Sequence, residues 1–210
     1  MTTYFITGIS TDVGKTVASA ILVEALEADY WKPIQAGELD NCDTKKVKSL
    51  VSNSKSKFHP NAFALKTPMS PHAAADIDGI SIDIKEIKAP KTKNNLVIEG
   101  AGGLLVPINN TQTVFDLIQP DYKVIVVSRH YLGSINHTLL TINLLKEKGF
   151  DVAIIFSGNE HKTTETIIKK MTNIPVIYRI DEEPYFDKNV IMAYAEEFLQ
   201  KQESHNFFKD

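Results

Sequence analysis

Cysteine, long apolar runs and clusters of basic residues are scarce in this sequence, and each scarcity excludes a class of protein. Cys42 is the only cysteine among 210 residues, which excludes intrachain disulfides and multi-cysteine metal sites. No apolar run approaches the length of a transmembrane helix, and the N-terminus carries neither a basic segment nor a signal cleavage site. The net charge is −3, without a Lys/Arg cluster interleaved with aromatic residues. We therefore expect a cytoplasmic protein that binds neither membranes nor nucleic acids.

The densest chemistry lies in one stretch, Gly8-Ile9-Ser10-Thr11-Asp12-Val13-Gly14-Lys15-Thr16. It is typical of a phosphate-binding loop, because an apolar run precedes it and a helical pattern follows it. A tight turn that opens a helix offers backbone N–H groups and the positive end of the helix dipole to phosphate oxygens. We expect Lys15 to reach the β- and γ-phosphates of a nucleotide, and the Thr16 hydroxyl to ligate Mg²⁺. Five residues, where the strict pattern has four, separate Gly8 from the Gly14-Lys15 pair, so a chance turn stays open as an alternative.

Short apolar runs alternate with helical patterns along the whole chain. The runs are continuous and mostly β-branched, as in strands buried on both faces, and they span 4–7, 30–31, 96–98, 124–127, 152–156 and 175–178. Helical patterns span 17–26, 135–148, 163–171 and 190–202, and the Lys/Ser-rich stretch 45–57 is a candidate for another, with an exposed turn at 52–57. This alternation predicts a single α/β domain over residues 1–210, with a three-layer, doubly wound and mainly parallel sheet of the P-loop NTPase type. Residues 204–210 are expected to fray.

Three further stretches follow predicted strands, where ligands of doubly wound sheets bind. Lys32, stiffened by Pro33, is a second cation for the phosphates, and Glu99, which precedes a glycine-rich turn, is a second candidate ligand of Mg²⁺. Gly133 and Ser134 open a helix whose first N–H groups can hold a carboxylate. Each has a plainer alternative: a surface lysine, a solvated glutamate and an ordinary helix cap.

Five motifs of this sequence resemble, in their order and spacing, the motifs of dethiobiotin synthetases. They are the long loop ending in Gly14-Lys15-Thr16, then Lys32-Pro33, Ser70-Pro71-His72, Glu99-Gly100-Ala101-Gly102-Gly103 and Leu132-Gly133-Ser134-Ile135-Asn136-His137. The resemblance covers almost the whole chain and fades after about Asn159.

This resemblance implies an ATP- and Mg²⁺-dependent cyclo-ligase of biotin biosynthesis that works as a homodimer. In that family 7,8-diaminononanoate and CO₂ give a carbamate, which attacks the γ-phosphate of ATP. The neighbouring amine then attacks the carbamic–phosphoric anhydride and closes the ureido ring of dethiobiotin. Because a carbamate is a weak nucleophile and an anion that approaches another anion, the enzyme must supply positive charge and alignment.

The resemblance also assigns residues to roles. The catalytic residues it implies are Lys32, Lys15 and Thr11. For the nucleotide it implies Asp12, Val13, Gly14, Lys15, Thr16, Val17 and Asn159. For Mg²⁺ it implies Thr16, Asp43 and Glu99, with the nearby Asp40 as an alternative to Asp43. For the diamine it implies Lys32, Ala36, Gly102, Gly133, Ser134, Ile135 and Asn136, the last four of them shared across a dimer interface.

Three positions depart from the family pattern. Asp12 stands where glutamate is usual, and Ala36 stands where a small hydroxyl residue is common. Arg179-Ile180-Asp181 replaces the glycine and proline pattern expected beside the base, so a nucleotide other than ATP, or a loose base pocket, stays open as an alternative. The rival function is that of a P-loop switch or partition-type ATPase that acts on a protein partner. Such ATPases usually carry an extra lysine, which is missing near the start of this loop.

Overall fold

The computed structural model describes residues 1–202 and 206–208, and its centre is a parallel sheet of seven strands. In sheet order β4-β2-β6-β1-β7-β8-β9, every neighbouring pair is parallel. The strands are β1 (Thr3–Gly8), β2 (Asp29–Trp31), β4 (Phe58–His59), β6 (Leu96–Gly103), β7 (Lys123–Arg129), β8 (Asp151–Ser157) and β9 (Val176–Ile180). The order reverses at β1, so the topology is doubly wound, as the alternating pattern predicts.

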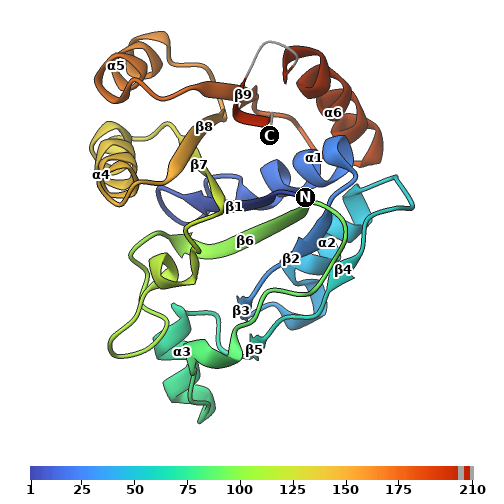
Figure 1. Ribbon diagram of the computed structural model, residues 1–210, viewed down its shortest axis with the longest axis vertical. Coiled ribbons are helices and arrows are strands. Elements are labelled where there is room, and N and C mark those ends of the chain that lie inside the picture. The colour runs from blue at the N-terminus through green and yellow to red at the C-terminus, as the bar shows by residue number, and fades with distance from the viewer. Residues whose placement is uncertain (203–205, 209–210) are drawn as a thin grey trace.

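Helices cover both faces of this sheet. They are α1 (Lys15–Leu26), α2 (Asp43–Leu50), α3 (Pro71–Asp78), α4 (Ser134–Glu147), α5 (Lys162–Thr172) and α6 (Lys188–Gln202). Figure 1 shows α1, α2 and α6 on one side of the sheet and α4 and α5 on the other. A small two-stranded sheet, β3 (Ile34–Ala36) and β5 (Phe63–Leu65), extends one end of the molecule beside α3. In the described part of the chain no helix is long and apolar enough to cross a membrane.

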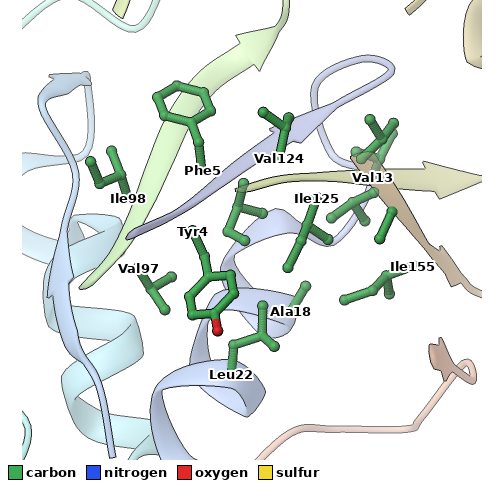
Figure 2. Close-up of a cluster of buried hydrophobic side chains, with 14 of the residues drawn as sticks. Tyr4, Phe5, Val13, Ala18, Leu22, Val97, Ile98, Val124, Ile125 and Ile155 are labelled. Carbon is green, nitrogen blue, oxygen red and sulfur yellow. The ribbon is translucent and has the colours of Figure 1, made fainter. Parts of the chain in front are cut away.

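The core explains why the strands are continuously apolar. Tyr4 and Phe5 are neighbours in β1 and are both buried, although their side chains leave opposite faces of the strand. Figure 2 shows Tyr4 turned toward Ala18 and Leu22 of α1, whereas Phe5 and Val124 lie on the other face. Since both faces are covered by other layers, each strand has an apolar side chain at nearly every position.

The segment after β3 differs from the sequence-based expectation. The helix expected within 45–57 is α2, which begins at Asp43 and ends at Leu50. The chain beyond it is not helical, because Glu24 of α1 accepts hydrogen bonds from both Ser52 N (2.7 Å) and Ser52 Oγ (2.6 Å). The expected turn at 52–57 therefore lies against α1.

The tail is described only in part. Residues 204, 205, 209 and 210 of the predicted frayed tail lie outside the described residues. Asn206–Phe208, however, form a short 3₁₀ turn in which Phe207 is buried. The ring of Phe208 packs 5.3 Å from that of Tyr4. These contacts have a physical reason, because two adjacent aromatic side chains gain more from burial than polar ones would. Fraying of the tail stays a prediction.

Candidate active site

The phosphate-binding loop (residues 8–16) joins the end of β1 to the start of α1. Gly8 has no room for a side chain, because a Cβ there would lie 2.6 Å from Ser10 O and 2.7 Å from Val13 Cγ2. Gly14 has φ +90° and caps α1, and Asp12 also adopts a left-handed conformation with φ +55°. The loop is thereby wound so that the N–H groups of the first turn of α1 are left without helical partners, as an anion cradle requires.

Two contacts hold this cradle in shape. Ser157, at the end of β8, donates a hydrogen bond of 2.6 Å from its hydroxyl to Val13 O. Lys15 folds back over the loop, and its Nζ donates to Ser10 O at 3.1 Å. The Lys15 side chain is nearly buried, and this burial lowers its pKa to about 8, although the carboxylate of Glu99 partly opposes the effect. A buried ammonium of this kind is short of anionic partners, and a phosphate would supply them.

Glu99, in β6, is the centre of a buried polar cluster. Its Oε1 accepts hydrogen bonds from Thr16 Oγ1 and from Lys32 Nζ, both at 3.0 Å. Its Oε2 accepts a hydrogen bond of 2.9 Å from the hydroxyl of Tyr30. Glu99 is 1% exposed, which excludes the solvated glutamate of the plainer alternative. Residues of β2, of the segment just after it and of α1 thus meet at a single carboxylate of β6.

Asp43 joins the same cluster from α2. Its Oδ2 lies 2.5 Å from Lys32 Nζ, so that Lys32 connects the two carboxylates of Asp43 and Glu99. The side chain of Gln35 fixes the start of α2, because its Oε1 accepts a hydrogen bond of 3.2 Å from Asp43 N. Asp40 is exposed and does not line the cleft, so the structure brings Asp43, and not Asp40, to the cluster.

A cleft of about 1060 Å³ opens over the loop and the cluster. The predicted residues that line it are Thr11, Asp12, Gly14, Lys15, Thr16, Val17, Lys32, Ala36, Asp43, Glu99 and Gly102. Val13 is buried beneath the loop. Within residues 1–202 and 206–208, no three His, Cys, Asp or Glu side chains gather as a metal site. A divalent cation in this cleft would therefore meet two carboxylates and the Thr16 hydroxyl as protein ligands, with phosphate and water oxygens for the rest.

One end of the cleft lies where β8 and β9 end. Gly158, Ile180 and Phe186 line it, and an ion pair of 2.7 Å between Arg129 and Glu182 flanks it. Asn159, which the sequence assigns to the base, is exposed and is not part of the lining.

The unusual residues Arg179-Ile180-Asp181 have structural partners at this end. Arg179 Nη1 donates to Gly158 O at 2.6 Å, and the Arg179 guanidinium also forms an ion pair with Glu165 of α5. Arg179 therefore ties the end of β9 to the turn after β8, and Ile180 and Asp181 follow it into the lining of the cleft.

The start of α4 lies apart from the cleft of the same chain. Gly133, with φ +98°, caps α4, and neither it nor Ser134, Ile135 or Asn136 lines the cleft. Asn136 is exposed, and the preceding Leu132 is fully exposed. The first residues of α4 therefore do not contribute to the cleft of their own chain.

Comparisons with known proteins identify the family. Residues 2–190 match a family model described as an AAA domain. A protein of Christiangramia forsetii named ATP-dependent dethiobiotin synthetase BioD is 63% identical over 199 residues, which cover 94% of this chain and 96% of that protein. A protein of the same name from Cytophaga hutchinsonii is 50% identical over 198 residues, which cover 93% and 96%. The chain belongs to the dethiobiotin synthetase family. The resemblance inferred from five short motifs is thereby confirmed.

Solved structures share the fold of this dethiobiotin synthetase family member at low identity. A putative plasmid partition protein of Borrelia burgdorferi, bound to AMPPNP, has a TM-score of 0.55 and 10% identity, and the match covers 96% of this chain and 97% of that one. The MinC:MinD cell division complex of Aquifex aeolicus has a TM-score of 0.51 and 16% identity, with coverage of 95% and 96%. Such likeness concerns the fold alone, and it confirms the predicted P-loop NTPase architecture.

Sequence reasoning missed three residues of the cluster and its rim. Tyr30 donates to the carboxylate of Glu99, and Gln35 accepts from the backbone N–H of Asp43. Lys46 of α2 lines the cleft and forms an ion pair of 2.7 Å with Glu38. A signal for Tyr30 is present in the sequence, because it precedes Lys32 by two residues and strand side chains two apart share a face. Neither Gln35 nor Lys46 carries such a signal, since their positions depend on where α2 begins.

Proposed function

We propose that this chain closes the ureido ring of dethiobiotin from 7,8-diaminononanoate, CO₂ and ATP, through a carbamate and a carbamic–phosphoric anhydride. The observation that carries the proposal is the meeting of Lys15, Lys32, Thr16, Asp43 and Glu99 on the floor of one cleft. The family of the chain supplies the substrates, and this cluster supplies the cations and oxygen ligands that their reaction needs.

ATP is proposed to bind with its phosphates on the loop and its base at the end lined by Ile180 and Phe186. Thr16, Asp43 and Glu99 would hold Mg²⁺, and this donor set fits, because Mg²⁺ prefers oxygen ligands, few carboxylates and bound phosphates. When bound, Mg²⁺ neutralises charge on the phosphates.

The two buried lysines are proposed to carry the chemistry of the phosphoryl transfer. Lys15 would stabilise the charge that develops on the γ-phosphoryl group, and Lys32 would hold the carbamate oxygen in line with it. Once the anhydride has formed, the second amine attacks its carbonyl carbon, phosphate leaves with the electrons of the broken C–O bond, and the new ureido nitrogen releases one proton to solvent.

The second substrate is proposed to lie along the side of the cleft formed by Thr11 and Gly102. A Cβ on Gly102 would lie 3.6 Å from Thr11 Oγ1 and 3.0 Å from Val106 Cγ2, so a larger residue would fill the space between them. Ala36 lines the same cleft and offers an apolar contact for the methylene chain of the diamine.

The substrate carboxylate is proposed to bind at the start of α4 of a second copy. In one chain, Gly133 and Asn136 do not line the cleft, which supports a site completed by a partner. The fully exposed Leu132 beside them supports a surface that a partner covers. Light scattering on the wild type and on Leu132→Glu tests this: a dimer that dissociates on substitution is expected, and a monomeric wild type would contradict the proposal.

Phosphate release from ATP is the direct test of the proposed reaction. We expect release only when both diaminononanoate and bicarbonate are present, with a ureido product of the expected mass. The exposed Lys48→Ala variant should behave as the wild type, and Lys15→Ala should be inactive. If the rate of ATP hydrolysis does not depend on the diamine, the switch or partition-type ATPase is favoured instead. That alternative is supported only by the shared fold.

A further inference from the structure

Tyr30 is a buried polar residue to which the proposed reaction assigns no role. It lies in β2 with no exposed surface, and its ring packs against Phe58 at a centroid distance of 6.2 Å. Its hydroxyl donates a hydrogen bond of 2.9 Å to Glu99 Oε2. In this pair the hydroxyl is the donor, because an ionised carboxylate only accepts.

The two oxygens of Glu99 have different partners. Oε2 accepts from Tyr30, whereas Oε1 accepts from Thr16 and Lys32, which both line the cleft. A partial rotation of the carboxylate about its last bond would break the bond to Tyr30. Because the two oxygens are chemically equivalent, what the phenol hydroxyl fixes is the plane of the carboxylate, with one oxygen directed at the cleft.

The pairing of β2 with β6 places the donors of this arrangement beside Glu99. β2 and β6 are parallel neighbours in which Tyr30 is in register with Val97, two residues before Glu99. Lys32 follows Tyr30 by two residues and approaches the same carboxylate. One short segment of chain thus supplies a neutral donor to one oxygen of Glu99 and a cation to the other.

We propose that Tyr30 is a positioning residue for the metal–nucleotide, since its hydroxyl holds Glu99 Oε2 and so keeps Oε1 directed at Thr16 and the phosphate end of the cleft. The inference rests on the proposed role of Glu99 as a ligand of Mg²⁺. Residues that orient a metal-binding carboxylate typically change metal affinity about 10- to 100-fold when they are removed.

The test is Mn²⁺ binding to the full chain in the presence of ADP, followed by the electron paramagnetic resonance signal of free Mn²⁺. Tyr30→Phe removes one oxygen atom and should weaken Mn²⁺ binding about tenfold. Tyr178→Phe is the matched control, because the Tyr178 hydroxyl also donates to a carboxylate, that of Glu197 at 2.8 Å, but lies outside the cleft. Its Mn²⁺ affinity should equal that of the wild type. Because no diamine is needed, the result is independent of the proposed ring closure.

Two further measurements separate positioning from structural support. In a Glu99→Gln background, adding Tyr30→Phe should cause no further loss of Mn²⁺ affinity, since the carboxylate to be oriented is gone. In turnover, Tyr30→Phe should raise the half-saturating Mg²⁺ concentration about tenfold and leave kcat at saturating Mg²⁺ near the wild-type value. A folded Tyr30→Phe protein whose Mn²⁺ affinity stays within about twofold of the wild type would overturn the proposal.

Discussion

Lys32 Nζ lies 3.0 Å from Glu99 Oε1, and both side chains are almost completely buried. The same ammonium is 2.5 Å from Asp43 Oδ2. Burial by itself lowers the pKa of Lys32, but the two carboxylates outweigh it, so that the pKa lies above its ordinary value. Lys32 therefore stays charged at neutral pH and balances two carboxylates that would otherwise repel each other.

Lys32→Met should lower both stability and activity. The variant keeps much of the aliphatic stem and removes the charge, which leaves Asp43 and Glu99 without their shared partner. Breaking a buried ion pair from one side costs about 3–5 kcal/mol, and losing one transition-state contact costs about a hundredfold in turnover. Urea unfolding and phosphate release measure the two effects, with exposed Lys48→Met as the control. Near-normal turnover in Lys32→Met would mean that Lys32 takes no part in the reaction.

Lys15→Met should stabilise the nucleotide-free protein while abolishing turnover. Burial lowers the pKa of Lys15 to about 8, so at pH 7 the folded chain holds an ammonium that the unfolded chain solvates better. Removing that charge should raise the free energy of unfolding by roughly 1–3 kcal/mol. Thermal unfolding without nucleotide measures the gain, and adding ATP should stabilise the wild type but not the variant. A variant less stable than the wild type would show that the Ser10 contact outweighs the desolvation.

Most of the site could be predicted because it sits at strand ends. Lys32 and Glu99 follow apolar runs, and a parallel sheet brings the carboxyl ends of its strands to one edge, so their meeting needed only the topology. The choice between Asp40 and Asp43 could not be made, because it depends on the exact residue at which α2 begins. The pairing of Tyr30 with Glu99 depends on which strands are neighbours, and no local pattern states that β2 lies beside β6.

The fold, like the site, could be predicted from local sequence only in part. Six strands of the large sheet follow from short, continuous apolar runs, whereas β4 has two residues, and β3 and β5 have three each, with no periodicity to recognise. Phe207 is buried by partners far away in the sequence, and the pair Phe207-Phe208 in the tail does not state which part of the fold covers it. Local sequence therefore predicts the layers, and long-range packing decides the small elements around them.

Asp29→Asn should destabilise the protein in a pH-dependent way. The carboxylate is buried, which by itself raises its pKa, but hydrogen bonds from Thr92 (2.7 Å), Lys57 N (3.0 Å) and two further side chains lower the pKa below its ordinary value. A carboxyl with a depressed folded pKa stabilises the protein above its unfolded pKa, about 4, and loses this effect as the pH falls below it.

At pH 5 the loss in Asp29→Asn should be about 1–3 kcal/mol, and it should shrink toward pH 3. Urea unfolding at the two pH values measures it, with exposed Asp121→Asn as the control. If Asp29→Asn lowers the free energy of unfolding by the same amount at both pH values, the charge of the Asp29 carboxylate does not contribute to stability.

Gln35 should matter for metal use although its side chain bonds only backbone groups. Its Oε1 accepts from Asp43 N at 3.2 Å and its Nε2 donates to Gly37 O at 3.1 Å, so it links the exit of β3 to the first residue of α2. The cap residue Cys42 gives α2 no side-chain hydrogen bond, which leaves Gln35 to bind a free N–H at the helix start.

Gln35→Leu removes this link and frees Asp43 to shift. Losing a cap of this kind costs about 1 kcal/mol, and a displaced ligand should raise the half-saturating Mg²⁺ concentration about tenfold. Gln112→Leu is the control, since Gln112 also accepts a hydrogen bond through Oε1, from Asn109 at 2.8 Å, and lies outside the cleft. If both variants lose about 1 kcal/mol and neither changes the Mg²⁺ requirement, Gln35 caps a helix and does nothing for the metal. A change confined to Gln35→Leu would mean that Asp43 reaches its ligand position only when α2 begins where Gln35 holds it.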